Sequence, residues 1–177
     1  MRVSQVYTAA PSEERCAVEM ETFALLDRLG IPYTWVAHDM ANTIEDCAAV
    51  DAALGISICK NLFLCNRQKT EFYLLAMPGD KLFQTKELSR QLGTARLAFA
   101  PPERMEELLD CAPGSASVLG MAYDKSHQVH LLMDREVYES EWFGCHPCKS
   151  DATLRIQTRD LLNIFFPYTG HPVTVVD

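Results

Sequence analysis

The strongest structural signal of the chain is a run of ten residues, Ile56-Ser57-Ile58-Cys59-Lys60-Asn61-Leu62-Phe63-Leu64-Cys65. Its β-branched and aromatic side chains are typical of a buried strand. Because successive side chains of a strand point to opposite faces, Lys60 belongs to one face and Asn61 to the other. A buried ammonium group is costly unless it finds a partner or reaches a cleft. Lys60 is therefore either a functional lysine or a residue at a strand end that extends to the rim of the sheet.

The segments around this run predict a mixture of strands and helices. A polar link at 66–70 joins it to a second strand at 71–77, which predicts a hairpin. Further strands are predicted at 33–37, 95–99, 128–133, 152–156 and 173–176. Helices are predicted from a Ser12 cap to 29, from a Thr43 cap to 55, and at 85–92, 102–109 and 158–166, with a loop at 142–148. Since no linker divides residues 1–177 and the elements do not alternate strictly, we predict one domain of the α+β or mixed α/β class.

The composition is that of a soluble globular protein, with 48% hydrophobic and 23% charged residues among 177. No apolar stretch reaches the roughly 18 residues of a membrane span, and the N-terminal residues lack the apolar core of a signal peptide. The seven cysteines are odd in number and several lie in apolar runs, as expected for buried free thiols. We therefore expect a cytoplasmic protein that does not bind membranes.

The net charge of −8 restricts the nucleic acids that the chain can bind. A protein that binds nucleic acid nonspecifically normally carries a basic face. The acidity therefore argues against binding to DNA and against wide contact with a tRNA. It does not exclude an enzyme that holds only the end of an RNA, because a few local lysines and arginines suffice there.

The run Cys145-His146-Pro147-Cys148 has the spacing of a redox or zinc motif. A thioredoxin-like site would open a helix after a strand, whereas this run precedes a predicted strand. A zinc site would need a second pair of ligands at a compatible spacing, and the sequence supplies none. We therefore expect neither a metal nor a cofactor. His146 is either a functional group near neutral pH or a residue that anchors its loop by a backbone hydrogen bond.

A loop of small residues, Gly114-Ser115-Ala116-Ser117, presents backbone N–H groups. Such a loop lets a ligand approach closely and can donate hydrogen bonds to a carbonyl or phosphate oxygen, although an ordinary tight connection has the same composition. The sequence has no phosphate-binding loop, nucleophile elbow, zinc-protease motif or dinucleotide-binding motif. These absences disfavour nucleotide hydrolysis, serine-hydrolase chemistry and dinucleotide binding.

Taken in order, these segments resemble the prolyl-tRNA editing family, the YbaK-like deacylases that stand alone or are inserted in prolyl-tRNA synthetase. The resemblance covers nearly the whole chain. The matching segments are 38–46 with His38 and Thr43, the Lys60 strand, the Gly114-Ser115 loop, 143–147 with His146, and 158–162 with Gly170-His171-Pro172. The family implies a single domain whose mixed, largely antiparallel sheet or partial barrel is flanked by helices.

The resemblance also implies a function, a trans-editing hydrolase that cleaves the ester between a wrong amino acid, above all alanine, and the 3′ end of tRNA(Pro). It implies catalytic roles for Lys60, Asn61 and His146. It implies substrate-binding roles for Gly114, Ser115, His38 and Thr43. The expected partners are the acceptor end of the mischarged tRNA(Pro) and, transiently, prolyl-tRNA synthetase. A pocket small enough to admit alanine and exclude the proline ring would explain the selectivity.

Two questions stay open at this point. Strand alternation places Asn61 opposite Lys60, so a shared pocket requires a kink or a position beside the cleft. The chain also departs from the family pattern at Val118, at Gly144-Cys145 and at Lys149-Ser150-Asp151. The substrate amino acid is therefore alanine, cysteine or serine, and a non-catalytic module that binds a tRNA end or an aminoacyl group is the alternative class of function.

Overall fold

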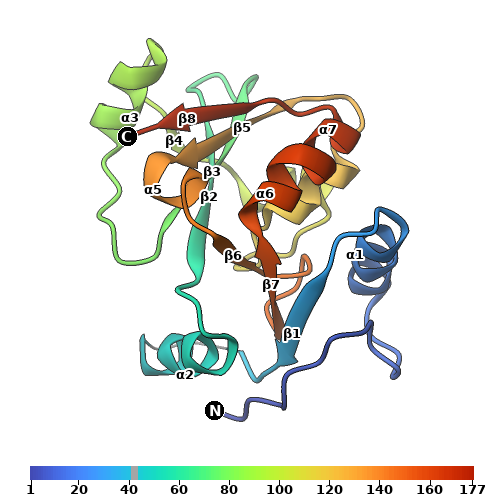
Figure 1. Ribbon diagram of the computed structural model, residues 1–177. Helices are drawn as coiled ribbons and strands as arrows, with labels where there is room; N and C mark the ends of the chain where they lie inside the picture. The colour runs from blue at the N-terminus through green and yellow to red at the C-terminus, as the bar shows by residue number, and fades with distance from the viewer. Residues whose placement is uncertain (41–43) are drawn as a thin grey trace.

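Two β-sheets form the framework of the computed structural model, which describes residues 1–40 and 44–177 (Figure 1). The smaller sheet is antiparallel, with the order β1 (Tyr33–Ala37), β7 (Ala152–Gln157), β6 (Trp142–Cys145). The larger sheet has the order β4 (Ala98–Phe99), β2 (Cys59–Cys65), β3 (Phe72–Pro78), β5 (Val129–Asp134), β8 (Val173–Val176). In it, β2 runs antiparallel to β3 and β4, whereas β3, β5 and β8 are parallel. The predicted mixed α+β class is confirmed.

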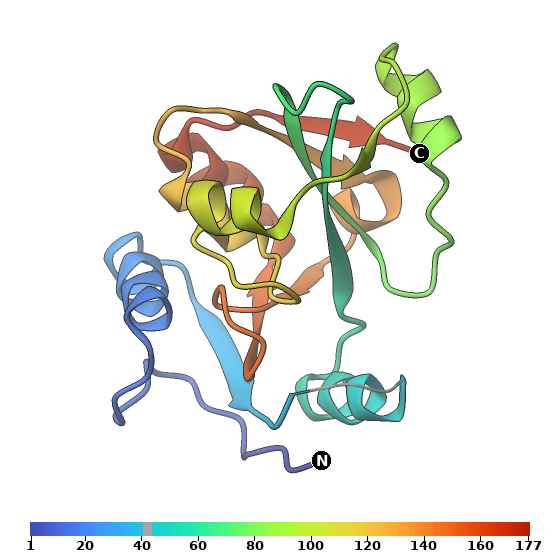
Figure 2. The same ribbon diagram turned by 180° about the vertical axis from the view of Figure 1, so that it is seen from behind.

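Helices flank the two sheets (Figures 1 and 2). They are α1 (Ala17–Arg28), α2 (Ile44–Leu54), α3 (Thr85–Leu92), α4 (Pro102–Leu109), the 3₁₀ helix η1 (Val118–Tyr123), α5 (Arg135–Tyr138), and the consecutive turns α6 (Thr158–Asp160), η2 (Leu161–Phe165) and α7 (Phe166–Thr169). Helix α1 packs on the smaller sheet through Phe23, whose ring lies 5.1 Å from that of Trp35. Among the described residues, no helix combines the length and the apolar character that crossing a membrane requires.

Strand β2 separates two hydrophobic clusters, as its alternating side chains predict. Phe63 and Cys65 belong to the main core, which also contains side chains of the smaller sheet such as Trp35. Leu64 belongs to a second cluster on the other face, together with Leu75 and other residues of the larger sheet. The predicted hairpin with β3 is confirmed, and in its register Lys60 lies opposite Met77.

Local structure differs from the sequence prediction at several places, among them the strand predicted at 95–99, of which only Ala98–Phe99 forms β4. Helix α1 begins at Ala17 rather than after Ser12, and its N-cap residue, Cys16, provides no side-chain hydrogen bond. The predicted loop at 142–148 contains strand β6, because Trp142 to Cys145 pair with β7. Tertiary structure explains this last difference, since a strand needs a paired neighbour and only the folded sheet brings β7 beside this segment.

A buried aspartate connects the end of η1 to the start of β5 and to the turn before β8. Asp124 is 2% exposed and accepts hydrogen bonds from the backbone N–H groups of Gln128 (3.0 Å) and Val129 (2.8 Å). Its Oδ2 also lies 3.0 Å from Nε2 of His171, which is 4% exposed. Three hydrogen bonds thus satisfy a carboxylate that would be costly to bury alone.

We expect Asp124→Asn to lower the free energy of unfolding by about 2 to 3 kcal/mol, because the amide replaces an ionised acceptor that three donors share. Urea denaturation of both proteins measures the difference. Asp110→Asn is the matched control, since Asp110 is exposed and has a left-handed backbone that asparagine tolerates. An Asp124→Asn protein as stable as the Asp110→Asn protein would show that this network is not stabilising.

Candidate active site

A cleft of about 1290 Å³ opens beside the first half of strand β2. Its walls come from α2, β2, the turn after β3, the start of α4, the loop before η1 and the segment from α5 to β6. Four residues that the sequence singles out line this cleft: Lys60, Asn61, Gly114 and His146. They come from segments far apart in the sequence, and the fold brings them to one place.

Two other predicted residues lie outside the lining of the cleft. Ser115 is 1% exposed and His38 is 7% exposed, and neither lines the cleft. Thr43 lies outside the described residues. The structure therefore favours supporting positions over direct substrate contact for Ser115 and His38.

Lys60 and Asn61 share the cleft because it follows a free edge of β2. Strand β3 pairs with β2 along its whole length, but β4 pairs only with Leu64 and Cys65. Within the described part of the chain, residues 59–62 thus have no partner strand on that side. The cleft reaches side chains of both faces along this edge, and every residue from 59 to 63 lines it. No kink in the backbone is needed.

The ammonium group of Lys60 forms no ion pair with any described carboxylate. Its Nζ donates a hydrogen bond to the backbone carbonyl of Lys81. The carboxylates of Asp134 and Glu136 pair with the Nζ of Lys81 instead, at 2.7 and 3.5 Å. Lys81 thereby leaves the charge of Lys60 available for an anionic or carbonyl oxygen of a ligand.

The side-chain oxygen of Asn61 has no hydrogen-bond donor among the described residues. This Oδ1 atom is buried, although the residue lines the cleft. A buried acceptor without a partner is costly, and the great majority of such atoms in proteins are hydrogen-bonded. The amide of Asn61 is therefore suited to bind a polar group of a ligand.

A chain of hydrogen bonds orients the ring of His146. Its Nδ1 lies 2.7 Å from the carbonyl oxygen of Ala152, which can only accept, so Nδ1 carries the proton. The hydroxyl oxygen of Thr153 lies 3.5 Å from this Nδ1 and 2.8 Å from Nε2 of His38. Nδ1 of His38 in turn lies 2.7 Å from the carbonyl oxygen of Asp39. The neutral ring of His146 therefore presents an unprotonated Nε2, which no described residue contacts by a hydrogen bond.

Burial keeps His146 uncharged. It lowers the pKa of this imidazole below the ordinary value, and the neighbouring His38 acts in the same direction, against the opposing effect of the hydrogen bond to Ala152. The two imidazole rings lie 6.2 Å apart. His146 is thus a hydrogen-bond acceptor at neutral pH, and His38 helps to hold the Thr153 hydroxyl behind it.

The loop before η1 brings backbone donors to the cleft. Gly114 has a φ of +81°, a left-handed conformation that favours glycine. The N–H of Ser115 already donates to the carbonyl of Ala112 at 2.9 Å, so it is not free to bind a substrate oxygen as the sequence suggested. The N–H groups of Gly114 and Ala116 have no acceptor within the described residues, and both residues line the cleft.

Ser117, which the sequence analysis did not single out, joins this loop to the His146 loop. Its hydroxyl donates to the carbonyl oxygen of His146 at 2.6 Å and accepts from the N–H of Leu119 at 3.2 Å. Figure 2 shows the 112–117 and 146–151 loops next to each other below α4. The preference of serine for helix N-caps predicts the second bond, but only the fold places His146 within reach of the first.

Arg155, also missed by the sequence analysis, holds helix α2 against the cleft. Its guanidinium lies 4.4 Å from the centre of the Trp142 ring, and its Nη1 donates to the carbonyl of Leu54 at 2.9 Å. Gly144 lies opposite Arg155 in the sheet. A cation at the last turn of α2 also complements the helix dipole.

The two cysteines of the Cys-x-x-Cys run are part of the core. Cys145 and Cys148 are each 1% exposed and do not line the cleft. Burial raises the pKa of Cys145, and a hydrogen bond with Cys111 together with burial raises that of Cys148. Thiols in such surroundings are poor nucleophiles. Among the described residues, no group of three His, Cys, Asp or Glu side chains is arranged to hold a metal ion.

The family model of the aminoacyl-tRNA editing domain matches residues 38–164, a segment that contains all seven predicted site residues. The chain belongs to this family. Its editing chemistry is hydrolysis of the ester that joins an amino acid to tRNA, so the chain is an aminoacyl-tRNA hydrolase.

Individual proteins that resemble the chain are also described as prolyl-tRNA editing or prolyl-tRNA synthetase associated proteins. The chain is 30% identical to the prolyl-tRNA editing protein ProX of Acetoanaerobium sticklandii, over 80% of this chain and 86% of the relative. It is 30% identical to the prolyl-tRNA synthetase associated domain-containing protein 1 of Danio rerio, over 98% and 94% of the two chains. A crystal structure described as a candidate trans-editing enzyme for prolyl-tRNA synthetase shares the fold, with a TM-score of 0.67 at 17% identity over 92% and 98% of the chains.

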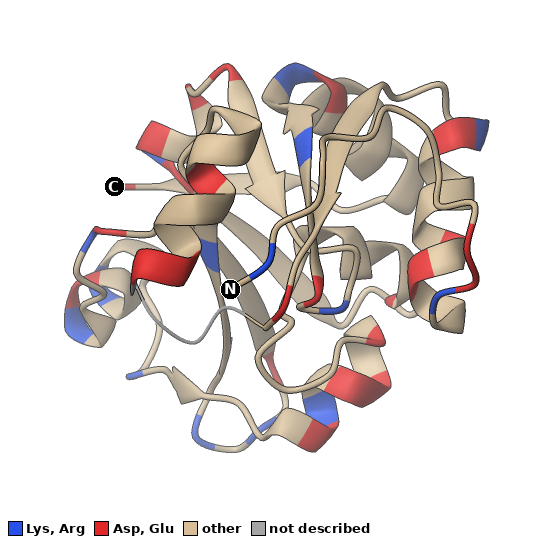
Figure 3. Cartoon of the chain, turned by 90° about the horizontal axis from the view of Figure 1, so that it is seen from below, with Lys and Arg blue, Asp and Glu red and all other residues tan. Residues whose placement is uncertain are grey.

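The cleft of this editing domain is large and its charges are mostly negative. Its volume of about 1290 Å³ exceeds the range of about 300 to 1000 Å³ of most small-ligand sites, so total volume does not separate alanine from proline. Its lining includes four carboxylates, from Asp51, Asp80, Glu136 and Glu141. In Figure 3, basic and acidic segments are interspersed along the ribbon seen from below.

We expect the stability of the protein to fall between pH 7 and pH 5 partly through His146. Its folded pKa lies below the unfolded value of about 6.5, so the unfolded chain binds more protons and gains population as the pH falls through this window. His146→Gln should therefore reduce the loss of unfolding free energy measured by urea denaturation at the two pH values. His130→Gln is the control, because His130 is exposed. Equal losses in wild type and His146→Gln would contradict the expectation.

Proposed function

We propose that the protein is a trans-editing deacylase that hydrolyses mischarged tRNA(Pro), with Ala-tRNA(Pro) as its principal substrate. The observation that carries the proposal is the meeting of Lys60, Asn61, Gly114 and His146 in one cleft. The prolyl-tRNA editing protein among the relatives supports tRNA(Pro) as the nucleic acid. The acidic chain then needs to hold only the acceptor end.

The reaction is the addition of water to an ester. A water oxygen attacks the carbonyl carbon, the carbonyl oxygen gains negative charge, and the bond to the ribose oxygen then breaks. The ribose oxygen takes up one proton of the water, the second proton is released to solvent, and the free amino acid leaves as its carboxylate. Because the ester is already activated, orientation of the water and stabilisation of the oxyanion account for most of the required catalysis.

Different residues of the cleft can orient the water, stabilise the oxyanion and hold the substrate. The N–H groups of Gly114 and Ala116 would bind the oxyanion, and the unprotonated Nε2 of His146 would accept a hydrogen bond from the water or from the free hydroxyl of the terminal ribose. Lys60 would hold a substrate oxygen or phosphate as a point charge. Asn61 would bind a polar group of the aminoacyl ester through the amide oxygen that lacks a partner.

The acidic lining of the cleft suits the aminoacyl group. An aminoacyl ester carries a free α-ammonium group, which carboxylates attract in a partly desolvated site. Alanine would be selected over proline by steric exclusion of the proline ring from the part of the cleft beside Lys60, Gly114 and His146. Steric exclusion of a larger residue discriminates more strongly than the loss of one methylene contact, which changes the binding free energy by only about 1 to 3 kcal/mol.

We expect Lys60→Ala to keep the fold and to slow deacylation by about 100-fold or more, the scale of removing one electrostatic stabiliser. Single-turnover hydrolysis of Ala-tRNA(Pro) measures the loss, and thermal unfolding checks the fold. Lys125→Ala is the control, because Lys125 is exposed and outside the cleft. Full activity of a folded Lys60→Ala protein would refute the role of Lys60. A wild-type protein that binds the tRNA without accelerating hydrolysis would instead indicate the non-catalytic binding module.

We expect wild-type protein to hydrolyse Ala-tRNA(Pro) at least about tenfold faster than Pro-tRNA(Pro), because the proposed steric selection would exclude the proline ring from the part of the cleft next to the reacting ester. A panel of tRNA(Pro) charged with alanine, serine, cysteine or proline measures the order of rates. Comparable rates for the alanyl and prolyl esters would rule out steric selection. Faster hydrolysis of the seryl or cysteinyl ester would reassign the amino acid while keeping the deacylase.

A further inference from the structure

An aromatic side chain stands exposed at the rim of the cleft. Phe99 is 66% exposed, although large apolar residues of a strand usually face a core. It belongs to the two-residue strand β4 and lines the cleft together with Lys60. An exposed aromatic ring that borders a ligand site is available for stacking with a flat group.

The register of the sheet places Phe99 on the same face as Lys60. Phe99 lies opposite Leu64 in the antiparallel pairing of β4 with β2, and directly opposed side chains share a face. Leu64 and Lys60 are four residues apart in β2, so they also share that face. The two positions are separated by roughly 13 Å along the strand, a distance that a short single-stranded segment can bridge.

A second ring supports Phe99 from one side. Phe83 lies 5.9 Å from it, centre to centre, in an edge-to-face arrangement with an interplanar angle of 63°. No other described aromatic ring packs against Phe99. The ring is therefore held in position by Phe83, while most of its surface faces solvent.

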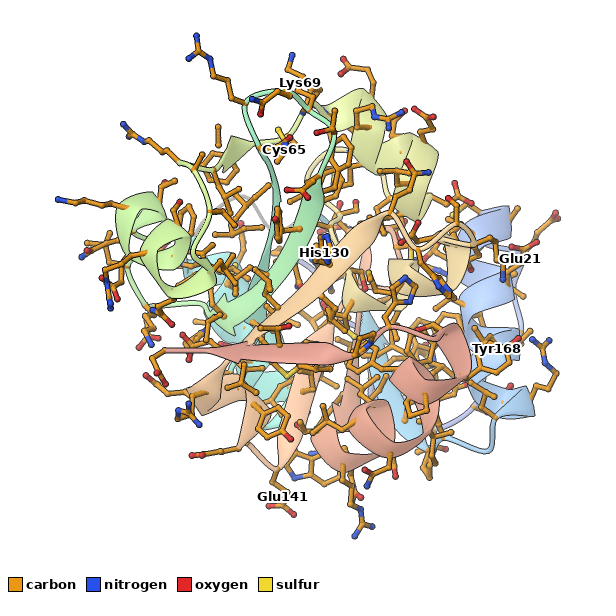
Figure 4. The ribbon with its side chains drawn as sticks, turned by 90° about the horizontal axis from the view of Figure 1, so that it is seen from above. Glu21, Cys65, Lys69, His130, Glu141 and Tyr168 are labelled. Atoms are coloured by element: carbon orange, nitrogen blue, oxygen red, sulfur yellow. The ribbon has the colours of Figure 1, made fainter. Side chains whose placement is uncertain are left out.

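Positive charges without an ion-pair partner among the described residues lie at both ends of strand β2. Lys60 lies at one end of β2, and Arg67 and Lys69 lie in the turn at its other end, where β2 meets β3. Within the described part of the chain, none of these three forms an ion pair with a carboxylate. Figure 4 shows Lys69 at the tip of the hairpin, beyond Cys65 of β2. Cations at both ends, with an aromatic ring between them, match the backbone and the bases of a single strand.

We propose that Phe99 is a stacking platform for a nucleobase of the single-stranded 3′ end of the tRNA, adjacent to the reacting ester. The proposal rests on the proposed function and adds a binding subsite to it. It explains how an acidic protein can hold an RNA end, since base stacking adds to the attraction that a few local cations provide. The phosphates next to the stacked base would run along the edge of β2 between Lys60 and the hairpin turn.

The test uses an acceptor-stem hairpin of tRNA(Pro) that carries 2-aminopurine in its single-stranded 3′ end. Fluorescence of this base is quenched when it stacks on an aromatic ring, so quenching reports stacking whether or not hydrolysis occurs. The variants are Phe99→Ala and Phe99→Trp. Tyr168→Ala is the control, because Tyr168 is also an exposed aromatic residue (49%) but lies on α7, outside the cleft (Figure 4).

We expect wild type, Phe99→Trp and Tyr168→Ala to quench the probe, and Phe99→Ala to bind the hairpin about tenfold or more weakly with little quenching. We expect the same variant to raise KM for the aminoacylated hairpin more than KM for an aminoacyl methyl ester, which has no base. Thermal unfolding of Phe99→Ala confirms that it is folded. Equal binding and quenching by folded Phe99→Ala and wild type would overturn the proposal. Quenching by a wild-type protein that hydrolyses no ester would support the subsite and refute the deacylase instead.

Discussion

The half-paired edge of strand β2 is the constraint on which the site depends. β3 covers one edge of this strand completely, whereas β4 covers only Leu64 and Cys65 of the other. A strand paired on both edges would bury its backbone and separate its two faces. Here the free segment exposes Lys60 and Asn61 to one cleft although they point to opposite faces. The same short pairing with β4 holds Phe99 at the rim.

The site is held in place by neighbours that do not touch the cleft themselves. The hydroxyl of Ser117 ties the loop of Gly114 to that of His146, and the hydroxyl of Thr153 lies between two imidazoles. Both hydroxyls belong to buried residues, so water does not compete for these bonds. Preorganised donors and acceptors need not reorganise when charge develops on an ester oxygen, which is the advantage that such a scaffold gives a hydrolase.

The cleft contains both an unpaired cation and several carboxylates, although the chain as a whole is acidic. Lys81 neutralises the carboxylates of Asp134 and Glu136 and so leaves Lys60 with its positive charge unshared. Burial keeps His146 neutral, so this ring accepts rather than donates at Nε2. The remaining carboxylates of the lining suit a positively charged amino group. Lys60 and the neutral ring of His146 thus suit the oxygen atoms of an aminoacyl ester, whereas the carboxylates suit its ammonium group.

Much of the fold and part of the site could be predicted from the sequence, because they rest on local chemistry. Runs of apolar, β-branched and aromatic residues predicted β2 and β3, Pro102 predicted the start of α4, and the spacing of motifs led to Lys60 and His146. Tertiary structure alone decided what depends on contacts between distant segments. It made residues 142–145 a strand, because their partner is β7, and it moved His38 and Ser115 out of the cleft. It also determined the roles of Ser117 and Arg155, whose partners lie 29 and 101 residues away. Hydrogen bonds across such separations leave no periodic pattern in a sequence, so only the folded chain reveals them.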